Sequence, residues 1–164
     1  MAETKLVDLL QNLGFLEGIA GPDLEQLASY AERVEFAEGQ QIFREGEPAQ
    51  HVYLIISGRV ALEVCAPAVG CRRILTVGPG ELLGWSPVLQ QPRLTATART
   101  LAATQSLRIP ASRILKLCED NPSFGYAFMQ RVALALAKRL RAARLQLLDV
   151  YGVESPAAPP ASTD

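Results

Sequence analysis

An antiparallel β jelly-roll barrel (a double-stranded β-helix) flanked by helices is the fold that this sequence indicates. Between residues 34 and 110, short apolar runs alternate with turn residues at the intervals typical of β-sandwiches and barrels. Elsewhere the apolar residues recur at helical spacing. We therefore expect a helical module at 1–33, the β-barrel at 34–110, C-terminal helices at 111–151 and a disordered tail at 152–164.

The N-terminal module is predicted to hold two helices. Gly14 and Gly18 follow the first as helix breakers, and its apolar positions at helical spacing are Leu6, Leu9, Leu10 and Leu13. Pro22 suits the first turn of the second helix, because its fixed φ is already helical. The apolar stripe of this helix runs from Leu24 to Ala31.

The barrel region begins near Val34, where the apolar period changes from that of a helix to two. The strongest β run is HVYLII at 51–56, which Ser57-Gly58 ends. One further strand is expected at the start of residues 80–98. The other predicted strands lie at 34–36, 41–43, 59–64, 72–77, 94–101 and 104–109.

Residues 80–98, GELLGWSPVLQQPRLTATA, give the clearest indication of a binding site. They are predicted to form a strand, a tight glycine turn, one short helical turn, a polar hook around Arg93 and a second strand. Backbone N–H groups at such a turn, together with one guanidinium, suit an anion. Ser86-Pro87 is typical of a cap followed by a first-turn proline.

Two helices are predicted after the barrel, one from Pro110 to Cys118 and a long one from about Pro122 to Tyr151. The long helix carries a heptad stripe, which predicts pairing of two copies. Packing of this helix on its own barrel alone is the other interpretation. The residues of the expected dimer stripe are Met129, Ala133, Leu136, Leu140, Ala143, Leu147 and Val150. The helix is also basic, and we interpret those charges as a solvated flank rather than a nucleic-acid contact.

The composition narrows the function classes. A net charge of −1 argues against a dedicated nucleic-acid binder. The sequence has no run of about 18 apolar residues, so no membrane span is predicted. One histidine and scattered cysteines give neither a catalytic constellation nor a metal-ligand cluster, so we expect no enzyme and no metal. The N-terminus carries acids early and lacks the apolar region of a signal peptide, so we expect a cytoplasmic protein. Cys65 and Cys71 would meet in a hairpin, but two separate reduced thiols are the interpretation that we favour.

Three segments together resemble a known family. GQQIFREGEPAQHVYLIISGRVAL at 39–62 resembles the opening strands of cyclic-nucleotide-binding domains, the sensor modules of bacterial catabolite activator proteins. Residues 80–98 look like their phosphate-binding cassette, and NPSFGYAFMQRVALALAKRLRAAR looks like their dimer helix. The resemblance implies a cyclic nucleotide, cAMP or cGMP, held by an arginine and by backbone N–H groups. Carried onto this sequence, the ligand-binding residues are Leu83, Gly84, Trp85, Ser86, Arg93, Leu94, Thr95 and Thr97.

The cassette departs from the family pattern in two places. Trp85 stands where the family has a glutamate that accepts from the ribose 2′-hydroxyl, and an indole N–H can only donate. Counting back from the strand at 104–109 puts Leu94 in the slot of the family's arginine, with Arg93 one residue early. A shift of one residue turns a side chain to the other face of a strand, although a bulge at 90–92 would correct it. Trp85 is open to three interpretations: an indole filling the sugar space, one stacking on a base or partner, or a core aromatic.

We expect from this a stand-alone sensor or regulatory module that binds a nucleotide-like or small anionic ligand and couples it to the dimer helix. The alternative is a degenerate fold without ligand that serves as a dimeric protein-interaction scaffold. In either case the partners are a second copy and an unidentified protein. The roughly 14 residues after Val150 are too few for a helix-turn-helix, so no DNA contact is expected from this chain alone.

Overall fold

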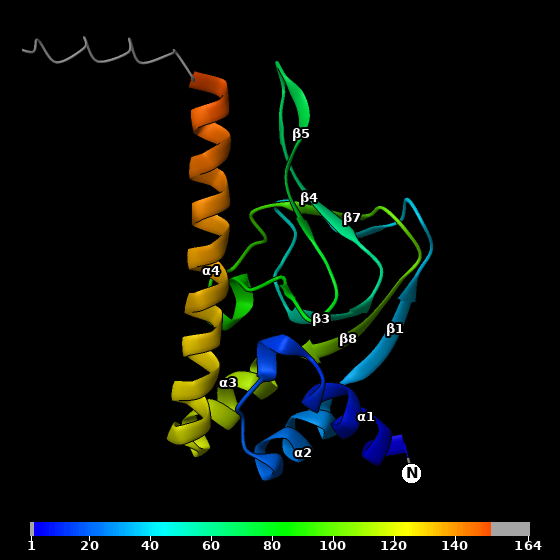
Figure 1. Cartoon of the computed structure of the whole chain (residues 1–164), viewed down its shortest axis with the longest axis vertical. Helices are drawn as coiled ribbons and strands as arrows, with labels where there is room; N and C mark the ends of the chain where they lie inside the picture. Colours follow the sequence, from blue (N-terminus) through cyan, green and yellow to red (C-terminus); the bar gives the residue numbers. More distant parts are fainter. Residues whose placement is uncertain (1, 152–164) are drawn as a thin grey trace, which may run out of the picture.

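The computed structural model describes residues 2–151, in which two facing β-sheets stand above a group of short helices and a long helix runs alongside (Figure 1). The helices are α1 Ala2–Gln11, η1 Gly14–Leu16, α2 Gly21–Tyr30, η2 Ser86–Leu89, α3 Ala111–Asp120 and α4 Pro122–Tyr151. The strands are β1 Glu32–Phe36, β2 Gln41–Phe43, β3 His51–Ser57, β4 Val60–Ala66, β5 Gly70–Val77, β6 Leu82–Leu83, β7 Thr97–Thr100 and β8 Thr104–Pro110. The η elements are single 3₁₀ turns.

The strands pair antiparallel in two four-stranded sheets, ordered β1-β8-β3-β6 and β2-β7-β4-β5. Apart from the β4–β5 hairpin, consecutive strands lie in different sheets, which is the order of a jelly roll. The mainly β fold with flanking helices is therefore confirmed. Because the ladders of the described strands stay within each sheet, closure into one barrel stays a prediction.

Strand β3 separates two hydrophobic cores, since its side chains alternate between the faces of its sheet. Tyr53 and Ile55 belong to the core between the two sheets, whereas Val52 and Leu54 belong to a core under the helices. Burial on both faces explains why this strand is a continuous apolar run rather than an alternating one. On neighbouring β8 the buried Ser106 satisfies its hydroxyl by donating to the carbonyl of Leu54 at 3.0 Å.

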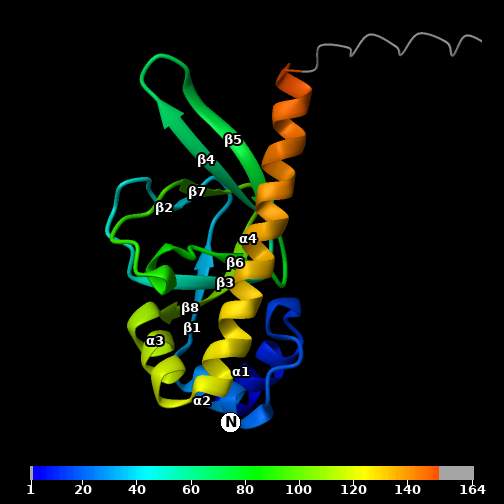
Figure 2. The same ribbon diagram turned by 90° about the vertical axis from the view of Figure 1, so that its left-hand side faces the viewer.

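The helical core joins the N-terminal helices to the first half of α4 (Figure 2). Phe124 and Phe128 are about 1% exposed and stack on each other with ring centroids 5.6 Å apart. Phe15 of η1 meets Phe128 edge-on, also at 5.6 Å. Burial of several large side chains in one cluster, at about 1.5–3 kcal/mol each, anchors the base of the long helix.

The second half of α4 extends past the sheets, and the β4–β5 hairpin rises beside it in both views (Figures 1 and 2). A 30-residue helix is about 45 Å long, so it exceeds the part that the core can cover. Two polar contacts fix it to the sheets: Gln146 Nε2 donates to the carbonyl of Ile74 at 2.6 Å, and Arg139 Nη2 donates to the carbonyl of Leu82.

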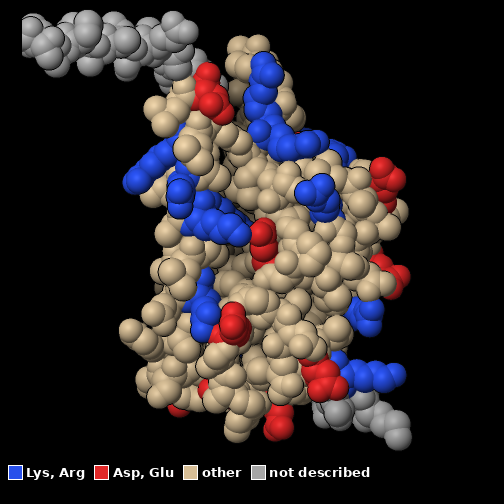
Figure 3. Space-filling view, in the orientation of Figure 1, with Lys and Arg blue, Asp and Glu red and all other residues tan. Residues whose placement is uncertain are grey.

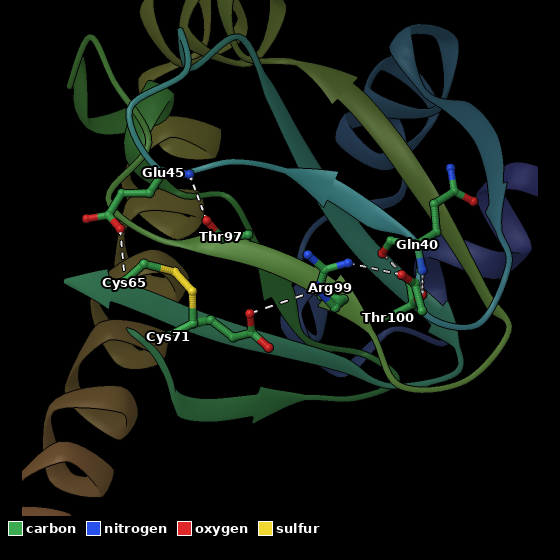
Figure 4. Close-up of polar contacts among 9 residues, drawn as sticks. Gln40, Glu45, Cys65, Cys71, Thr97, Arg99 and Thr100 are labelled. Atoms are coloured by element: carbon green, nitrogen blue, oxygen red, sulfur yellow. Dashed lines mark hydrogen bonds and ion pairs between the residues drawn. A yellow bond between two sulfur atoms is a disulfide. The ribbon is translucent and has the colours of Figure 1, made fainter. Parts of the chain in front are cut away.

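The structure corrects the expectation of two separate thiols at Cys65 and Cys71. The two residues are directly opposed on β4 and β5 and form a disulfide with an S–S distance of 2.09 Å (Figure 4). Gly70, with φ +75°, closes the tight turn that brings them together. Several element boundaries also differ from the prediction, most of all at the first helix, which ends at Gln11, and at the strand predicted at 94–101, which covers only Thr97–Thr100. The predicted tail at 152–164 and the side chain of Val150 lie outside the described residues.

Gly58, in the turn between β3 and β4, provides a test of this packing. Its φ is +98°, and a Cβ atom there would lie 2.4 Å from Thr104 Oγ1 and 2.6 Å from the carbonyl of Ala103. Gly39 has φ +77° with nothing within 4 Å, so it is a matched control for backbone strain alone. We expect Gly39→Ala to lower the free energy of unfolding by about 1–2 kcal/mol, and Gly58→Ala by about 1–3 kcal/mol more. Equal losses in chemical denaturation would contradict the close approach.

Candidate functional site

The 80–98 cassette is folded as the sequence predicts, with a strand, a glycine turn and a single helical turn. Leu83 on β6 pairs with Tyr53 on β3, and η2 follows directly. Gly84 has φ +77°, and a Cβ atom there would lie 3.2 Å from the carbonyl of His51. The glycine is therefore required both by its left-handed backbone and by close contact with β3.

The cassette side chains divide between the two cores. Leu83 and Leu94 belong to the core between the sheets, whereas Val88 belongs to the helical core and the half-buried Trp85 packs against it. The structure thus selects the third interpretation of Trp85, a core aromatic, since its indole lies against the helical core rather than in the space between the sheets. Ser86, 3% exposed, is the first residue of η2.

Leu94, rather than Arg93, faces the space between the sheets. The segment pairs with the 46–47 turn: the Gly46 N–H donates to the Leu94 carbonyl at 2.8 Å, and the Leu94 N–H donates to the Glu47 carbonyl at 3.0 Å. This pairing leaves Leu94 8% exposed and turns Arg93 outward, where Nη1 donates to the Gly46 carbonyl at 2.7 Å. The loop at 90–92 does not bring Arg93 into the space between the sheets.

The predicted hydroxyl donors are not gathered around Arg93. Thr97 is buried and its Oγ1 accepts from the Glu45 N–H at 3.0 Å, a contact that ties β7 to the loop after β2 (Figure 4). Thr95 is exposed. The two threonines therefore lie in different environments, one buried and one exposed, and do not form a single site with Arg93.

A small pocket of about 170 Å³ opens between the sheets beside the cassette. Ligand pockets commonly measure about 300–1,000 Å³, so this one is small for a nucleotide. Of the predicted ligand-binding residues, Leu94 alone is among its described lining. The lining residues are Ile42, Phe43, Glu47, Pro48, Gln50, His51, Tyr53 and Leu94. Tyr53 lies on the face of β3 that points between the sheets, and the local sequence gives no signal for any of Tyr53, His51 and Glu47 as pocket residues.

The electrostatics of this pocket do not favour a phosphate. No Lys or Arg is among the described residues that line it, and Glu47 adds a carboxylate. Burial lowers the pKa of His51, and the nearby Arg108 lowers it further against an opposing effect of Glu32. The imidazole therefore favours its neutral form. Burial also raises the pKa of Tyr53, so the phenol keeps its proton.

The predicted dimer stripe lies on a flank of α4 that the described chain leaves largely open. Leu140 and Leu147 are 54% and 55% exposed, while Met129 and Leu136 are half-buried at the edge of the helical core. Ala133 and Ala143 are exposed. Within residues 2–151, the helices lack the combination of length and hydropathy needed to span a bilayer, and the described His, Cys, Asp and Glu residues form no metal-type group.

Comparison with known proteins agrees with this geometry. Residues 33–121 match the cyclic nucleotide-binding domain family. The chain is 26% identical over 150 residues to the CRP-like cAMP-activated global transcriptional regulator of Mycobacterium tuberculosis, covering 91% of this chain and 65% of the relative. It is 31% identical over 130 residues to the cyclic AMP receptor protein of Thermus thermophilus, covering 79% and 58%.

A solved cyclic nucleotide-binding domain from Methylobacillus flagellatus has the same fold, with a TM-score of 0.76 and 19% identity over 90% of this chain and 83% of that one. The chain spans about 58–65% of the length of the two curated relatives. The similarity to these relatives therefore concerns only part of each of them.

His51 offers a pH-dependent test of the pocket. We expect its pKa in the folded protein to lie below the ordinary 6.5, so the folded state binds fewer protons than the unfolded state and stability falls as the pH drops below about 6.5. Arg108→Gln should raise this pKa, whereas Glu32→Gln should lower it. A titration of the imidazole by NMR measures all three values. An unshifted pKa, or shifts of the opposite sign, would contradict the environment described.

Proposed function

The chain belongs to the cyclic nucleotide-binding domain family, and we propose that it is a regulatory module of that family that pairs through α4 and does not bind cAMP in the family's usual manner. The observation that carries this proposal is the register at Leu94. Leu94, which the count along the sequence puts in the arginine slot, packs in the core between the sheets, and the guanidinium of Arg93 is outside it.

The energetic cost of this register is large for a cyclic phosphate. A hydrogen bond to a charged group contributes about 1.5–3 kcal/mol, or roughly ten- to a hundredfold in affinity. The pocket would also have to accept the anion beside Glu47, without a compensating cation in its described lining. The same geometry supports a structural role for the cassette, which packs Val88 and Trp85 against the helices.

Arg93 supports a second candidate, in which a small anion binds at the rim of the cassette. Its guanidinium is exposed, and the contact that the structure gives it is a neutral backbone carbonyl, that of Gly46. An exposed arginine without a carboxylate partner can form a bidentate pair with a phosphate. This candidate keeps ligand sensing within residues 80–98 but moves the ligand outside the sheets.

Dimerisation is supported by the open stripe on α4. Two leucines more than half exposed at heptad spacing leave apolar surface that a second helix would cover. The small side chains of Ala133 and Ala143 would let two helix backbones approach closely. We propose a homodimer that transmits its state to a protein partner in the cytoplasm, in keeping with the regulatory role of the mycobacterial relative.

Calorimetric titration with cAMP, cGMP and a cyclic dinucleotide tests the ligand proposal. We expect no binding heat from the unmodified chain at nucleotide concentrations up to about 1 mM. Any binding free energy would then be weaker than about −4.1 kcal/mol. The double variant Arg93→Leu with Leu94→Arg moves the guanidinium inward and should gain cAMP binding, with Arg93→Leu alone as its control. Micromolar binding of cAMP to the unmodified chain would overturn the proposal. Nucleotide binding abolished by Arg93→Ala would support the rim candidate instead.

The dimer has an independent test. The pair Leu140→Glu with Leu147→Glu should reduce the mass in solution from two chains to one, because it places carboxylates in the apolar stripe. The pair Leu145→Glu with Leu148→Glu is a matched control, since those leucines are 55% and 66% exposed but lie off the stripe. Analytical ultracentrifugation distinguishes the two. An unchanged mass for the stripe variant, or dissociation by the control, would rule out this interface.

A further inference from the structure

A second and much larger cavity lies between α4, the N-terminal helices and the loop before β6. Its volume is about 900 Å³, within the range of ligand pockets. On α4 its lining extends from Arg131 to Gln146, a length of about 22 Å along the helix. Figure 3 shows the molecule hollowed between the long helix and the strands, with basic side chains beside the hollow.

The lining of this cleft consists of an apolar part and a charged part. Most of its lining is apolar and comes from segments far apart in the chain, including Leu9, Leu13, Phe15, Ile56, Leu75 and Leu134. Its charged lining consists of Arg131, Lys138, Arg139 and Glu81. Three cations against one carboxylate leave a positive wall beside an apolar surface.

Arg139 is the central charge of that wall. Its Nη2 donates to the Leu82 carbonyl, while its Nη1 is buried and has no hydrogen-bond partner among the described residues. The carboxylate of Glu81 does not satisfy it, because one oxygen contacts Lys138 Nζ at 3.3 Å and the other accepts from the Gly78 N–H at 3.2 Å. A buried cationic N–H without an acceptor is costly, so an incoming anion would remove a penalty as well as add an attraction.

The electrostatic environment of Arg139 is consistent with this. Burial lowers the pKa of its guanidinium, and Glu81 raises it. An arginine side chain loses its proton only far above neutral pH, so the group remains charged.

The cleft and the dimer stripe lie on different flanks of α4. None of the six stripe residues from Met129 to Leu147 is among the described residues that line the cleft. A second copy seated on the stripe therefore leaves the cleft walls on α4 uncovered.

We propose that this cleft binds an amphipathic monoanion of the fatty-acid class. The carboxylate would lie at Arg139 and Lys138, and the acyl chain would lie along the apolar wall between α4 and η1. A purely polar anion would leave that apolar wall unused, and a neutral apolar ligand would leave the Arg139 N–H unsatisfied. This cleft borders the first residues of the cassette, Gly80 to Leu82, but neither Arg93 nor Leu94 is among its described lining residues.

Titration calorimetry of the full chain with laurate, below its micellar concentration, tests the proposal. We expect saturable binding of one laurate per chain. Lauryl alcohol should bind at least about tenfold more weakly, because it has no carboxylate to pair with the cations of the cleft. Lys138→Gln combined with Arg131→Gln should weaken laurate binding to a similar degree. Arg141→Gln combined with Arg144→Gln, on exposed positions of the same helix, is the matched control and should leave binding unchanged.

A second variant tests the apolar half. Ala142→Trp narrows the cleft while keeping every charge, and should abolish laurate binding with thermal unfolding unchanged. The Arg93 and Leu94 variants should leave laurate binding as it is, which separates this site from the Arg93 and Leu94 end of the cassette. The proposal fails if laurate does not bind, if it and lauryl alcohol bind equally, or if laurate binds only after Leu140→Glu with Leu147→Glu. The last result would mean that a second copy covers the cleft.

Discussion

The backbone hydrogen bonds that join Leu94 to the 46–47 turn decide how the cassette is built. They hold two segments that are distant in sequence in a fixed antiparallel register. Because side chains alternate across an extended strand, placing Leu94 inward places Arg93 outward. The core between the sheets gains a leucine from this arrangement, and the guanidinium of Arg93 lies outside that core.

In the same register, the cassette contributes side chains to both hydrophobic cores. Leu83 and Leu94 contribute to the core between the sheets, while Val88 packs with Ala111 and Ile114 of α3 in the helical core. Phe124 and Phe128 extend that second core to α4. A displacement of η2 would therefore disturb α3 and the base of the long helix. The cleft at Arg139 is lined by a later part of the same helix. The position of α4 therefore affects both the packing of the cassette and the shape of the cleft.

The sequence contained much of the fold and less of the site. Apolar periodicity located all the helices of more than one turn and most strands, because a core demands regular spacing. The offset of Arg93 could be counted from the sequence, but the orientation of its side chain depended on the pairing of Leu94 with the distant 46–47 turn. Pairing of Cys65 and Cys71 depended on the hairpin register. The cleft had no local signal, since it joins α1, β5 and α4.

The inward orientation of Leu94 is the claim on which the functional conclusions rest, and NMR distance contacts within the folded chain test it directly. Leu94 lines the same pocket as Phe43 and Tyr53, so we predict strong contacts from the Leu94 methyl groups to both aromatic rings. The side-chain protons of Arg93 should show none. Contacts from Arg93 to those rings, with the Leu94 methyl groups in solvent, would contradict the register and return the guanidinium to the space between the sheets.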